Sequence, residues 1–172
     1  MQIFVTGASG FVGGAATLAL LDHGHAVAAM SRSAGSDEVI RALGAEPVRC
    51  DLESVSARHI DSADVVLHCA AFVDVWGPRD AWYKGNVLGT ENVLRAARQA
   101  GTKRFIHMGT EAGIVHGQHI NGADETYPLA PDSPYPYCAT KAQAEQRVLA
   151  ANGPEFSTLV LRPRFIWGPG DK

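Results

Sequence analysis

The sequence has few cysteines, no excess of positive charge and no long apolar run, and each absence excludes a class of protein. Cysteine occurs three times in 172 residues, as Cys50, Cys69 and Cys138. This odd, widely spaced set argues against a disulfide framework, and no Cys-x-x-Cys or Cys/His spacing predicts a metal site. We therefore expect no bound metal, and reduced thiols in a cytoplasmic protein.

The charge balance argues against nucleic acid as a partner. Lys and Arg total 15 and Asp and Glu total 18, for a formal net charge of −3, whereas nucleic-acid binding depends on a basic surface. The longest apolar stretch in a predicted helix, residues 15–21, is ended by Asp22. No basic region precedes the first strand pattern, so we expect neither a signal peptide nor a membrane segment.

Apolar runs alternate with helical patterns along the chain, which is typical of a parallel sheet covered by helices. The third connection, residues 53–62, is short, and glycines and prolines in residues 111–133 predict a long irregular loop. The pattern predicts one α/β domain with a doubly wound parallel sheet. Its expected strands are 3–6, 26–30, 47–49, 65–69, 105–108 and 158–161, and its expected helices are 11–23, 37–43, 82–100 and 134–152.

Three glycines lie where the first predicted strand turns into a helix. Gly7, Gly10 and Gly13 occupy a place where backbone amides and the helix dipole favour a phosphate, and where a Cβ would hinder its approach. The GxxGxxG spacing differs from the usual GxGxxG, and no Lys-Ser/Thr follows as in a nucleoside triphosphate loop. We predict a dinucleotide pyrophosphate site. The alternative is that the glycines only allow close packing of the helix on the strand.

Residues after the second and third strands bear on which dinucleotide binds. Ser31-Arg32-Ser33 offers a cation and hydroxyls where an NAD enzyme would place an acidic residue. Arg32 suits the 2′-phosphate of NADP, so NADP is the preferred cofactor and NAD the alternative, unless Arg32 is simply an exposed loop arginine. Asp51 and Leu52 are candidates for contact with the adenine, and Asp51 is almost equally suited to cap a helix.

Tyr137 and Lys141 lie one helical turn apart, so their side chains share a face of the last predicted helix. A phenol, with an ordinary pKa of about 10, needs its anion stabilised to act as an acid-base group, and an ammonium and a helix N-terminus both do this. Tyr135 does not share that face. Such a pair is also common on solvated helices, but Thr110 follows the fifth strand, at the edge where doubly wound folds bind ligands.

Together these motifs resemble the extended branch of the short-chain dehydrogenase/reductase superfamily, also called the NAD-dependent epimerase/dehydratase group. Residues 105–112 are most like its 3-beta-hydroxysteroid dehydrogenase-like and dihydroflavonol-reductase-like members, with Gly109 in place of a usual serine. The resemblance implies a Rossmann fold with strand order 3-2-1-4-5-6. The matching segments are Thr6-Gly7-Ala8-Ser9-Gly10-Phe11-Val12-Gly13, His68-Cys69-Ala70-Ala71, Asn86-Val87-Leu88-Gly89-Thr90-Glu91-Asn92, Tyr137-Cys138-Ala139-Thr140-Lys141 and Leu161-Arg162-Pro163-Arg164-Phe165-Ile166-Trp167-Gly168-Pro169-Gly170.

The resemblance assigns roles to individual residues. Tyr137 is expected to be the acid-base residue, Lys141 to bind the nicotinamide ribose and lower the pKa of the tyrosine, and Thr110 to hydrogen-bond the substrate oxygen. His68 is expected only to finish a strand. The full set of expected cofactor contacts is Gly7, Ser9, Gly10, Phe11, Val12, Gly13, Arg32, Asp51, Leu52, Ala70, Ala71, Tyr137, Lys141, Pro163 and Phe165.

The implied function is an NAD(P)-dependent oxidoreductase that transfers a hydride between nicotinamide and a secondary alcohol or ketone. A nucleotide-sugar epimerase with the same Tyr/Lys pair and a noncatalytic dinucleotide sensor are the alternatives. A dehydratase is disfavoured because Glu111-Ala112 follows Thr110, without the second carboxylic acid that dehydration needs. The expected partner is a small-molecule substrate, and a homodimer is compatible with the resemblance.

Members of the superfamily continue past this pattern into a substrate-binding lobe and a further strand. Residues 1–172 are therefore expected to be the NAD(P)-binding Rossmann domain of a longer protein, without the C-terminal lobe that selects the substrate. A chain ending at Lys172 is expected to bind dinucleotide weakly and to turn over little.

Overall fold

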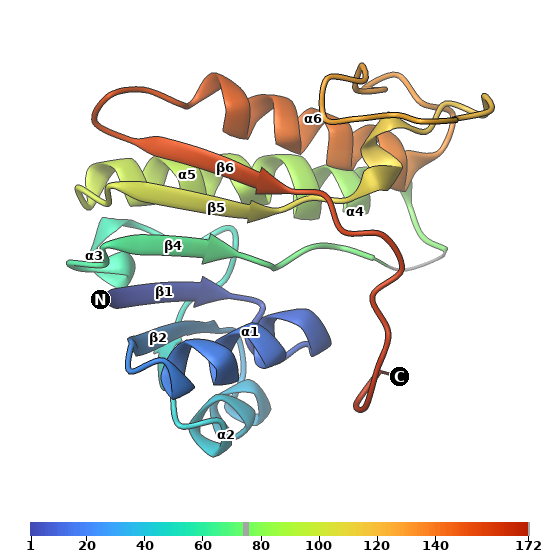
Figure 1. Ribbon diagram of the computed structural model, residues 1–172. Coiled ribbons are helices and arrows are strands. Elements are labelled where there is room, and N and C mark those ends of the chain that lie inside the picture. Colours follow the sequence, from blue (N-terminus) through green and yellow to red (C-terminus); the bar gives the residue numbers. More distant parts are fainter. Residues whose placement is uncertain (74–75, 172) are drawn as a thin grey trace.

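A computed structural model describes residues 1–73 and 76–171, which contain a six-stranded parallel sheet with helices on both faces (Figure 1). The strand order is β3-β2-β1-β4-β5-β6, and each neighbouring pair is parallel. This confirms the predicted doubly wound sheet and its strand order. The strands are β1 (Gln2–Thr6), β2 (Ala26–Ser31), β3 (Glu46–Arg49), β4 (Val65–His68), β5 (Arg104–Met108) and β6 (Ser157–Leu161).

Three predicted helices depart from their bounds by two residues or more, and the one expected at 134–152 is two residues shorter at each end. α2 (Ala34–Ala42) begins three residues earlier than expected, because the Ser33 hydroxyl caps it by accepting a hydrogen bond from the Ser36 amide. The expected helix 82–100 contains the π-helical segment η1 (Tyr83–Leu88). The other helical segments are α1 (Phe11–Asp22), α3 (Ala57–Ile60), α4 (Arg79–Trp82), α5 (Gly89–Gln99), the 3₁₀ turn η2 (Glu111–Ile114) and α6 (Pro136–Ala150).

Two apolar cores lie on opposite faces of the sheet, because successive side chains of a strand point to opposite sides. In β1, Ile3 and Val5 belong to the core beside α1 and α2, whereas Phe4 belongs to the core beside α5 and α6. All three are at most 4% exposed. This two-sided burial explains why the strands read as unbroken apolar runs.

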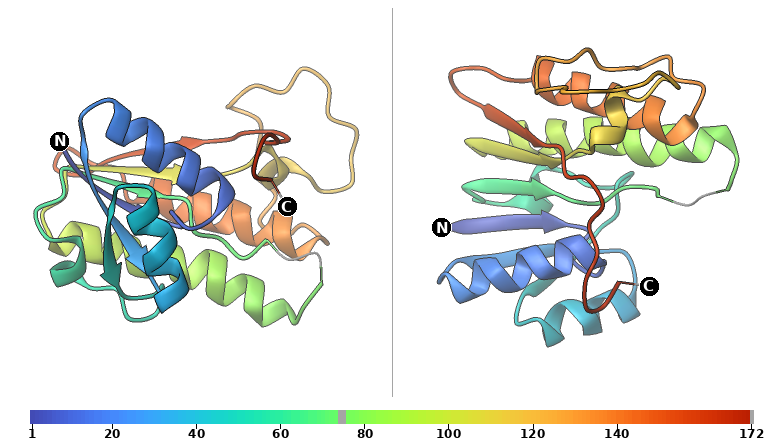
Figure 2. Two further views of the ribbon diagram at one scale, coloured as in Figure 1. Left: turned by 90° about the horizontal axis from the view of Figure 1, so that it is seen from below. Right: turned by 45° about the vertical axis from the view of Figure 1, so that its right-hand side comes forward.

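The carboxyl ends of β1, β4 and β5 meet at one edge of the sheet, and the last segment of the chain crosses that edge (Figure 1). After β6, residues 162–171 pass these strand ends and reach α1, where Gly168 lies against the Phe11 ring. The irregular loop predicted at residues 111–133 is present after η2 and lies beside α6 (Figure 2). The edge is thus lined by turns from distant parts of the sequence.

Candidate active site

Two glycines in the turn between β1 and α1 have no room for a side chain. Gly7 has a φ of +77°, and a Cβ there would lie 2.8 Å from the Ala70 backbone nitrogen. A Cβ on Gly13 would lie 2.2 Å from the Gly7 carbonyl oxygen. Close packing therefore accounts for these two residues without a ligand.

Gly10 differs, because it is exposed at the N-cap of α1, where no side chain caps the helix. Its amide donates to the Gly7 carbonyl oxygen at 3.0 Å, which closes the turn. Ser9 and Gly10 are exposed and Phe11 and Val12 begin the helix, so the turn ends at a helix N-terminus, where phosphates commonly bind. Pyrophosphate binding there stays a prediction.

At the end of β2, the Ser31 side chain contacts a carboxylate of α2, that of Asp37. It accepts a hydrogen bond from the buried Ser31 hydroxyl at 2.5 Å and is paired with Arg49 and Arg41. These contacts, the bond from Ser31 first, lower the pKa of Asp37. Arg32 follows Ser31 in the chain and is exposed. Its role as a ligand of a 2′-phosphate stays a prediction, and the two arginines nearby in α2 and β3 are paired with Asp37.

Asp51 and Leu52 have structural contacts of their own. One carboxylate oxygen of Asp51 accepts hydrogen bonds from the amides of Glu53 and Ser54 and from the Ser54 hydroxyl, which together lower the pKa of Asp51. Asp51 thus caps a turn, and the alternative interpretation as a helix N-cap is wrong, because Ser56 is the N-cap of α3. Leu52 packs against α5 so closely that a Cβ on Gly89 would lie 2.9 Å from its Cδ1.

The structure brings Tyr137 and Thr110 together, as expected. Tyr137 lies in the first turn of α6, after Pro136, and Thr110 directly follows the end of β5. Hydrogen bonding with the Thr110 hydroxyl lowers the pKa of Tyr137, but burial of the phenol outweighs it, and the Glu111 charge also raises the pKa. The net result is a raised pKa, which favours the protonated phenol.

Lys141 lies on the same face of α6 but does not lower the pKa of Tyr137. Its side chain is buried, and its Nζ donates to the Met108 carbonyl oxygen at 2.8 Å. Burial lowers the pKa of Lys141 to about 8, with Cys69 and Glu145 acting in the opposite direction. The expectation that this ammonium holds the tyrosine pKa down is wrong for this structure, because the ammonium is bonded to Met108 and burial dominates at the phenol.

His68 does more than finish a strand. Its Nδ1 is 2.7 Å from the Thr6 hydroxyl, and its Nε2 is 3.0 Å from the Thr90 hydroxyl. Since Thr90 gives its proton to the Asn86 carbonyl oxygen, it accepts from His68 Nε2–H, so Thr6 donates to Nδ1. Burial lowers the pKa of His68 to about 3, which keeps the ring neutral. The ring thereby joins β1, β4 and α5 beneath the glycine turn.

Asn86 is a second residue with a structural role at the site. The sequence showed it only as part of a motif. It lies in η1, and its side-chain amide accepts from the Phe72 amide at 2.7 Å and donates to the Phe72 carbonyl oxygen at 3.1 Å. Its Nδ2 also lies 3.1 Å from the Thr140 hydroxyl on α6. Asn86 therefore fixes the segment after Ala70 and Ala71 relative to the helix of Tyr137 and Lys141.

A buried ion pair lies behind the Tyr/Lys helix face. The Glu145 side chain is 2% exposed; its Oε1 accepts a hydrogen bond from Arg162 Nε at 2.8 Å and lies 2.7 Å from Arg162 Nη2 in an ion pair. A Cβ on Gly109 would lie 2.8 Å from Val160 Cγ1 and 2.9 Å from the Leu161 carbonyl oxygen. The absence of a serine at position 109 therefore follows from the close approach of β6.

Residues expected near the nicotinamide lie at the same edge of the sheet. The Pro163 carbonyl oxygen accepts from the Glu111 amide at 3.2 Å, which ties the segment after β6 to the segment after β5. Phe165 has a φ of +39°, and its side chain is 81% exposed. Its ring lies under the Arg164 guanidinium, 5.6 Å away. Pro163 thus belongs to the edge, whereas Phe165 points largely to solvent.

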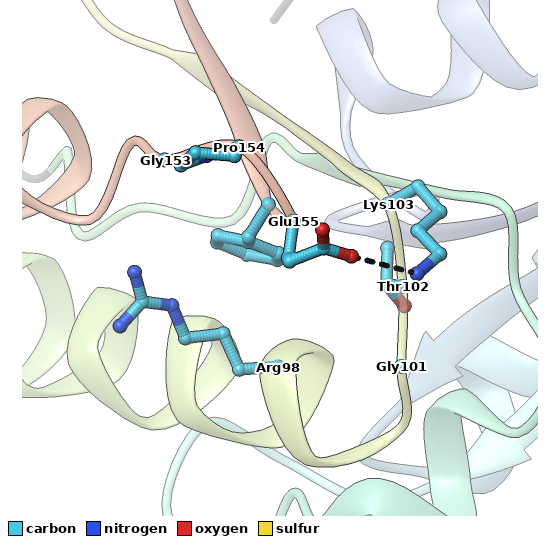
Figure 3. A pocket seen from close by; sticks show the side chains of 8 residues that line it. Arg98, Gly101, Thr102, Lys103, Gly153, Pro154 and Glu155 are labelled. Carbon is cyan, nitrogen blue, oxygen red and sulfur yellow. Dashed lines mark ion pairs between the residues drawn. The ribbon is translucent and has the colours of Figure 1, made fainter.

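A hollow of about 420 Å³ lies at the other end of the strands, away from this edge. It is formed around Lys103, which precedes β5, and Glu155, which precedes β6, and these two side chains form an ion pair at 3.7 Å (Figure 3). The Arg98 guanidinium lies 5.1 Å above the Phe156 ring. None of the predicted site residues lines this hollow.

Three further findings concern the described part of the chain. Cys50, Cys69 and Cys138 are free. Within residues 1–73 and 76–171, no helix has the length and apolar character needed to cross a bilayer. In the same residues, His, Cys, Asp and Glu form no cluster of metal-binding type.

The fold agrees with a comparison of the sequence with known families. The model of the 3-beta hydroxysteroid dehydrogenase/isomerase family matches residues 4–172. The chain belongs to this family. The resemblance to extended short-chain dehydrogenases/reductases is thereby confirmed, in the 3-beta-hydroxysteroid dehydrogenase-like group.

Two curated relatives are similar over nearly the whole chain. A Stigmatella aurantiaca protein named 4-hydroxy-2-methyl-3-oxo-4-farnesyl-3,4-dihydroquinoline-1-oxide ketoreductase is 44% identical over 99% of this chain and 52% of its own. A 2-alkyl-3-oxoalkanoate reductase from Stenotrophomonas maltophilia is 41% identical over 100% of this chain and 53% of its own. The chain therefore spans about half the length of the curated relatives it matches.

Solved structures of two kinds share the fold. A short-chain dehydrogenase/reductase superfamily protein from Agrobacterium tumefaciens with bound NAD has a TM-score of 0.78 and 31% identity, covering 94% of this chain and 48% of its own. A UDP-glucuronic acid 4-epimerase from Bacillus cereus in complex with NAD has a TM-score of 0.80 and 25% identity, covering 94% of this chain and 55% of its own. Both relatives bind a nicotinamide dinucleotide.

Proposed function

We propose that residues 1–172 form the dinucleotide-binding domain of an oxidoreductase that reduces a ketone, or oxidises the corresponding secondary alcohol, with Tyr137 as the acid-base residue. The observation that carries this proposal is the placement of the Tyr137 phenol beside the Thr110 hydroxyl. Both lie at the carboxyl edge of the sheet, where doubly wound folds bind ligands. The ketone reductases among the relatives support this choice of substrate class.

The residues present fit a nicotinamide dinucleotide. Gly7 and Gly13 form a turn that a Cβ would fill, and the helix N-terminus at Gly10 is suited to a pyrophosphate. A bound nicotinamide supplies or accepts the hydride. Lys141 gives one N–H to Met108, and an ammonium has two more donors, which suit the hydroxyls of a ribose.

Tyr137 and Thr110 perform the proton chemistry. The Thr110 hydroxyl holds the substrate oxygen, and the Tyr137 phenol gives its proton to that oxygen as the carbonyl carbon becomes an alcohol carbon. The raised pKa of Tyr137 keeps the phenol protonated near neutral pH, which suits ketone reduction. Alcohol oxidation uses the same groups in reverse, after the phenol has lost its proton.

The direct test is ketone-dependent oxidation of the reduced cofactor. The full-length protein is incubated with NADPH or NADH and a 2-alkyl-3-oxoalkanoate or a 3-ketosteroid, and nicotinamide absorbance and alcohol product are both followed. Equal amounts of oxidised cofactor and alcohol support the proposal. Binding of the cofactor without oxidation by any ketone would instead indicate a dinucleotide sensor.

NADP is the proposed cofactor in preference to NAD, because the exposed Arg32 directly follows β2, where an NAD enzyme would place an acidic residue. We expect NADP to bind more tightly than NAD, and Arg32→Ala to remove most of that difference. A fluorescence titration of both cofactors measures this. Equal affinities in the parent protein would exclude Arg32 as a phosphate ligand.

A nucleotide-sugar epimerase is the second candidate, favoured by the epimerase among the similar folds. An epimerase would keep its cofactor bound and convert a UDP-sugar without net oxidation. Release of oxidised cofactor during turnover distinguishes the reductase from it. A cytoplasmic location, inferred from the free cysteines, and a homodimer are further proposals from the sequence.

A further inference from the structure

The hollow of about 420 Å³ lies at the amino end of β5 and β6, at the opposite end of the strands from Tyr137 and Thr110. It is formed by the end of α5, the residues that lead into β5 and the turn that leads into β6 (Figure 3). No residue of the proposed reaction lines it. A ligand bound there would therefore be independent of the proposed function.

Backbone hydrogen bonds hold the walls of this hollow in place. The Gly153 and Phe156 backbones exchange two bonds, at 3.0 and 3.1 Å, and the Lys103 carbonyl oxygen accepts from the Ser157 amide at 2.9 Å. Gly101 and Gly153 carry no side chain that would fill the space, and a Cβ on either would meet no heavy atom within 4 Å. The hollow is thus a property of the fold.

Two cations and one carboxylate line the hollow, and in Figure 3 Arg98 and Lys103 lie on either side of Glu155. Arg98 has no carboxylate partner in the described residues; it donates to the Ala151 carbonyl oxygen and lies 5.1 Å above the Phe156 ring. Lys103 pairs with Glu155 at 3.7 Å, but these side chains are 72% and 92% exposed, and exposed pairs are weak. The lining therefore has one unbalanced positive charge.

Thr102 adds a buried hydroxyl to the same wall. The residue is 2% exposed and lines the hollow, and its Oγ1 has no hydrogen-bond partner within the part of the chain that the structure describes. Native proteins leave few buried polar atoms in this state. A hydroxyl can donate as well as accept, so a ligand oxygen is the kind of partner that it lacks.

We propose that this hollow binds a small organic monocarboxylate with a compact apolar body. The carboxylate lies between Arg98 and Lys103 and balances the one excess charge, whereas a phosphate monoester would bring about two charges. The apolar body packs against Pro154 and Phe156. Thr102 turns about its Cα–Cβ bond and donates to a carboxylate oxygen of the ligand.

Benzoate is the probe for this site, titrated into the full-length protein while backbone amide shifts are followed by nuclear magnetic resonance. The amides of Gly101, Lys103 and Gly153 should shift together and saturate with a dissociation constant of about 1 mM. Benzamide has the same shape without the charge and should bind about tenfold more weakly, because hydrogen bonds to charged groups are the stronger ones. Phenyl phosphate should bind no more tightly than benzoate.

Four variants test the assignment of individual residues. Arg98→Met keeps an unbranched chain over Phe156 but removes the charge, and should weaken benzoate binding about tenfold. Thr102→Val should weaken it about threefold through the lost hydroxyl. Glu155→Gln should strengthen it about threefold, because no carboxylate then competes for Lys103. Arg95→Met is the control, because Arg95 lies on the same helix, donates to Asn92 and does not line the hollow.

Several results would contradict the proposal. Equal affinities for benzoate and benzamide, no saturation by about 10 mM benzoate, or an Arg98→Met protein that binds like the parent would overturn the site. Phenyl phosphate bound about tenfold more tightly than benzoate would overturn the choice of a monocarboxylate. An unchanged affinity in Thr102→Val would remove that hydroxyl from the site. Ketone reduction is not part of these measurements, so their failure leaves the proposed function as it stands.

Discussion

Replacement of Lys141 should make the protein more stable and, at the same time, inactive. Burial lowers the pKa of Lys141 from 10.5 to about 8. One pH unit corresponds to about 1.4 kcal/mol, so keeping this ammonium charged costs the folded state about 3 kcal/mol. Lys141→Met removes that cost. It also removes the hydrogen bond to the Met108 carbonyl oxygen, worth about 1 kcal/mol, which leaves a net gain of about 2 kcal/mol near neutral pH.

The stability that Lys141→Met gains over the parent should decrease as the pH rises. Below about pH 8 the lysine is charged in both the folded and the unfolded chain, so the cost is complete. Between about 8 and 10.5 the folded protein has lost the proton and the unfolded chain keeps it, so the parent gains stability with rising pH. The advantage of Lys141→Met should therefore shrink across this range and vanish above it.

Urea unfolding of the parent and Lys141→Met at about pH 7 and about pH 10 measures this difference. Lys103→Met is the matched control, because Lys103 is 72% exposed, and its replacement should change stability by no more than about 0.5 kcal/mol. A Lys141→Met protein less stable than the parent at about pH 7, or a difference that does not change with pH, would refute the reasoning. If Lys141→Met is more stable than the parent but inactive, then Lys141 serves the reaction at a cost to the stability of the fold.

Two other substitutions test the packing around the site. Gly13→Ala places a Cβ 2.2 Å from the Gly7 oxygen, so it should cost about 1–3 kcal/mol and weaken NADPH binding in a fluorescence titration. Gly35→Ala, with nothing within 4 Å of its Cβ, should leave binding unchanged. Arg162→Met leaves the Glu145 charge buried and should cost about 3–5 kcal/mol in urea unfolding, much of it recovered when Glu145→Gln is added. Unchanged stability of the single variant would contradict the buried pair.

The sequence alone predicted the features that are determined within short segments of the chain. All six strands were predicted within one residue of their observed bounds, because buried parallel strands are continuous apolar runs. The meeting of Tyr137 and Thr110 was also predictable. Thr110 is fixed by the end of a strand and Tyr137 by the start of a helix, and the strand order brings these ends together.

Features that depend on contacts between distant segments were not predictable. The tautomer of His68 follows from the hydroxyls of Thr6 and Thr90, which are 62 and 22 residues away. The raised pKa of Tyr137 follows from burial, which helix spacing does not reveal. The pairing of Glu145 with Arg162 requires β6 to pass behind α6, and neither residue is distinctive in the sequence.

The central claim is that the Tyr137 phenol moves the proton, and its most direct test is the steady-state rate of ketone-dependent NADPH oxidation by Tyr137→Phe. Tyr135→Phe is the control, because Tyr135 is exposed and precedes the helix. We predict that Tyr137→Phe loses about 100- to 10,000-fold of the rate with unchanged NADPH affinity, while Tyr135→Phe keeps the parent rate. A Tyr137→Phe protein that turns over as fast as the parent would contradict the account.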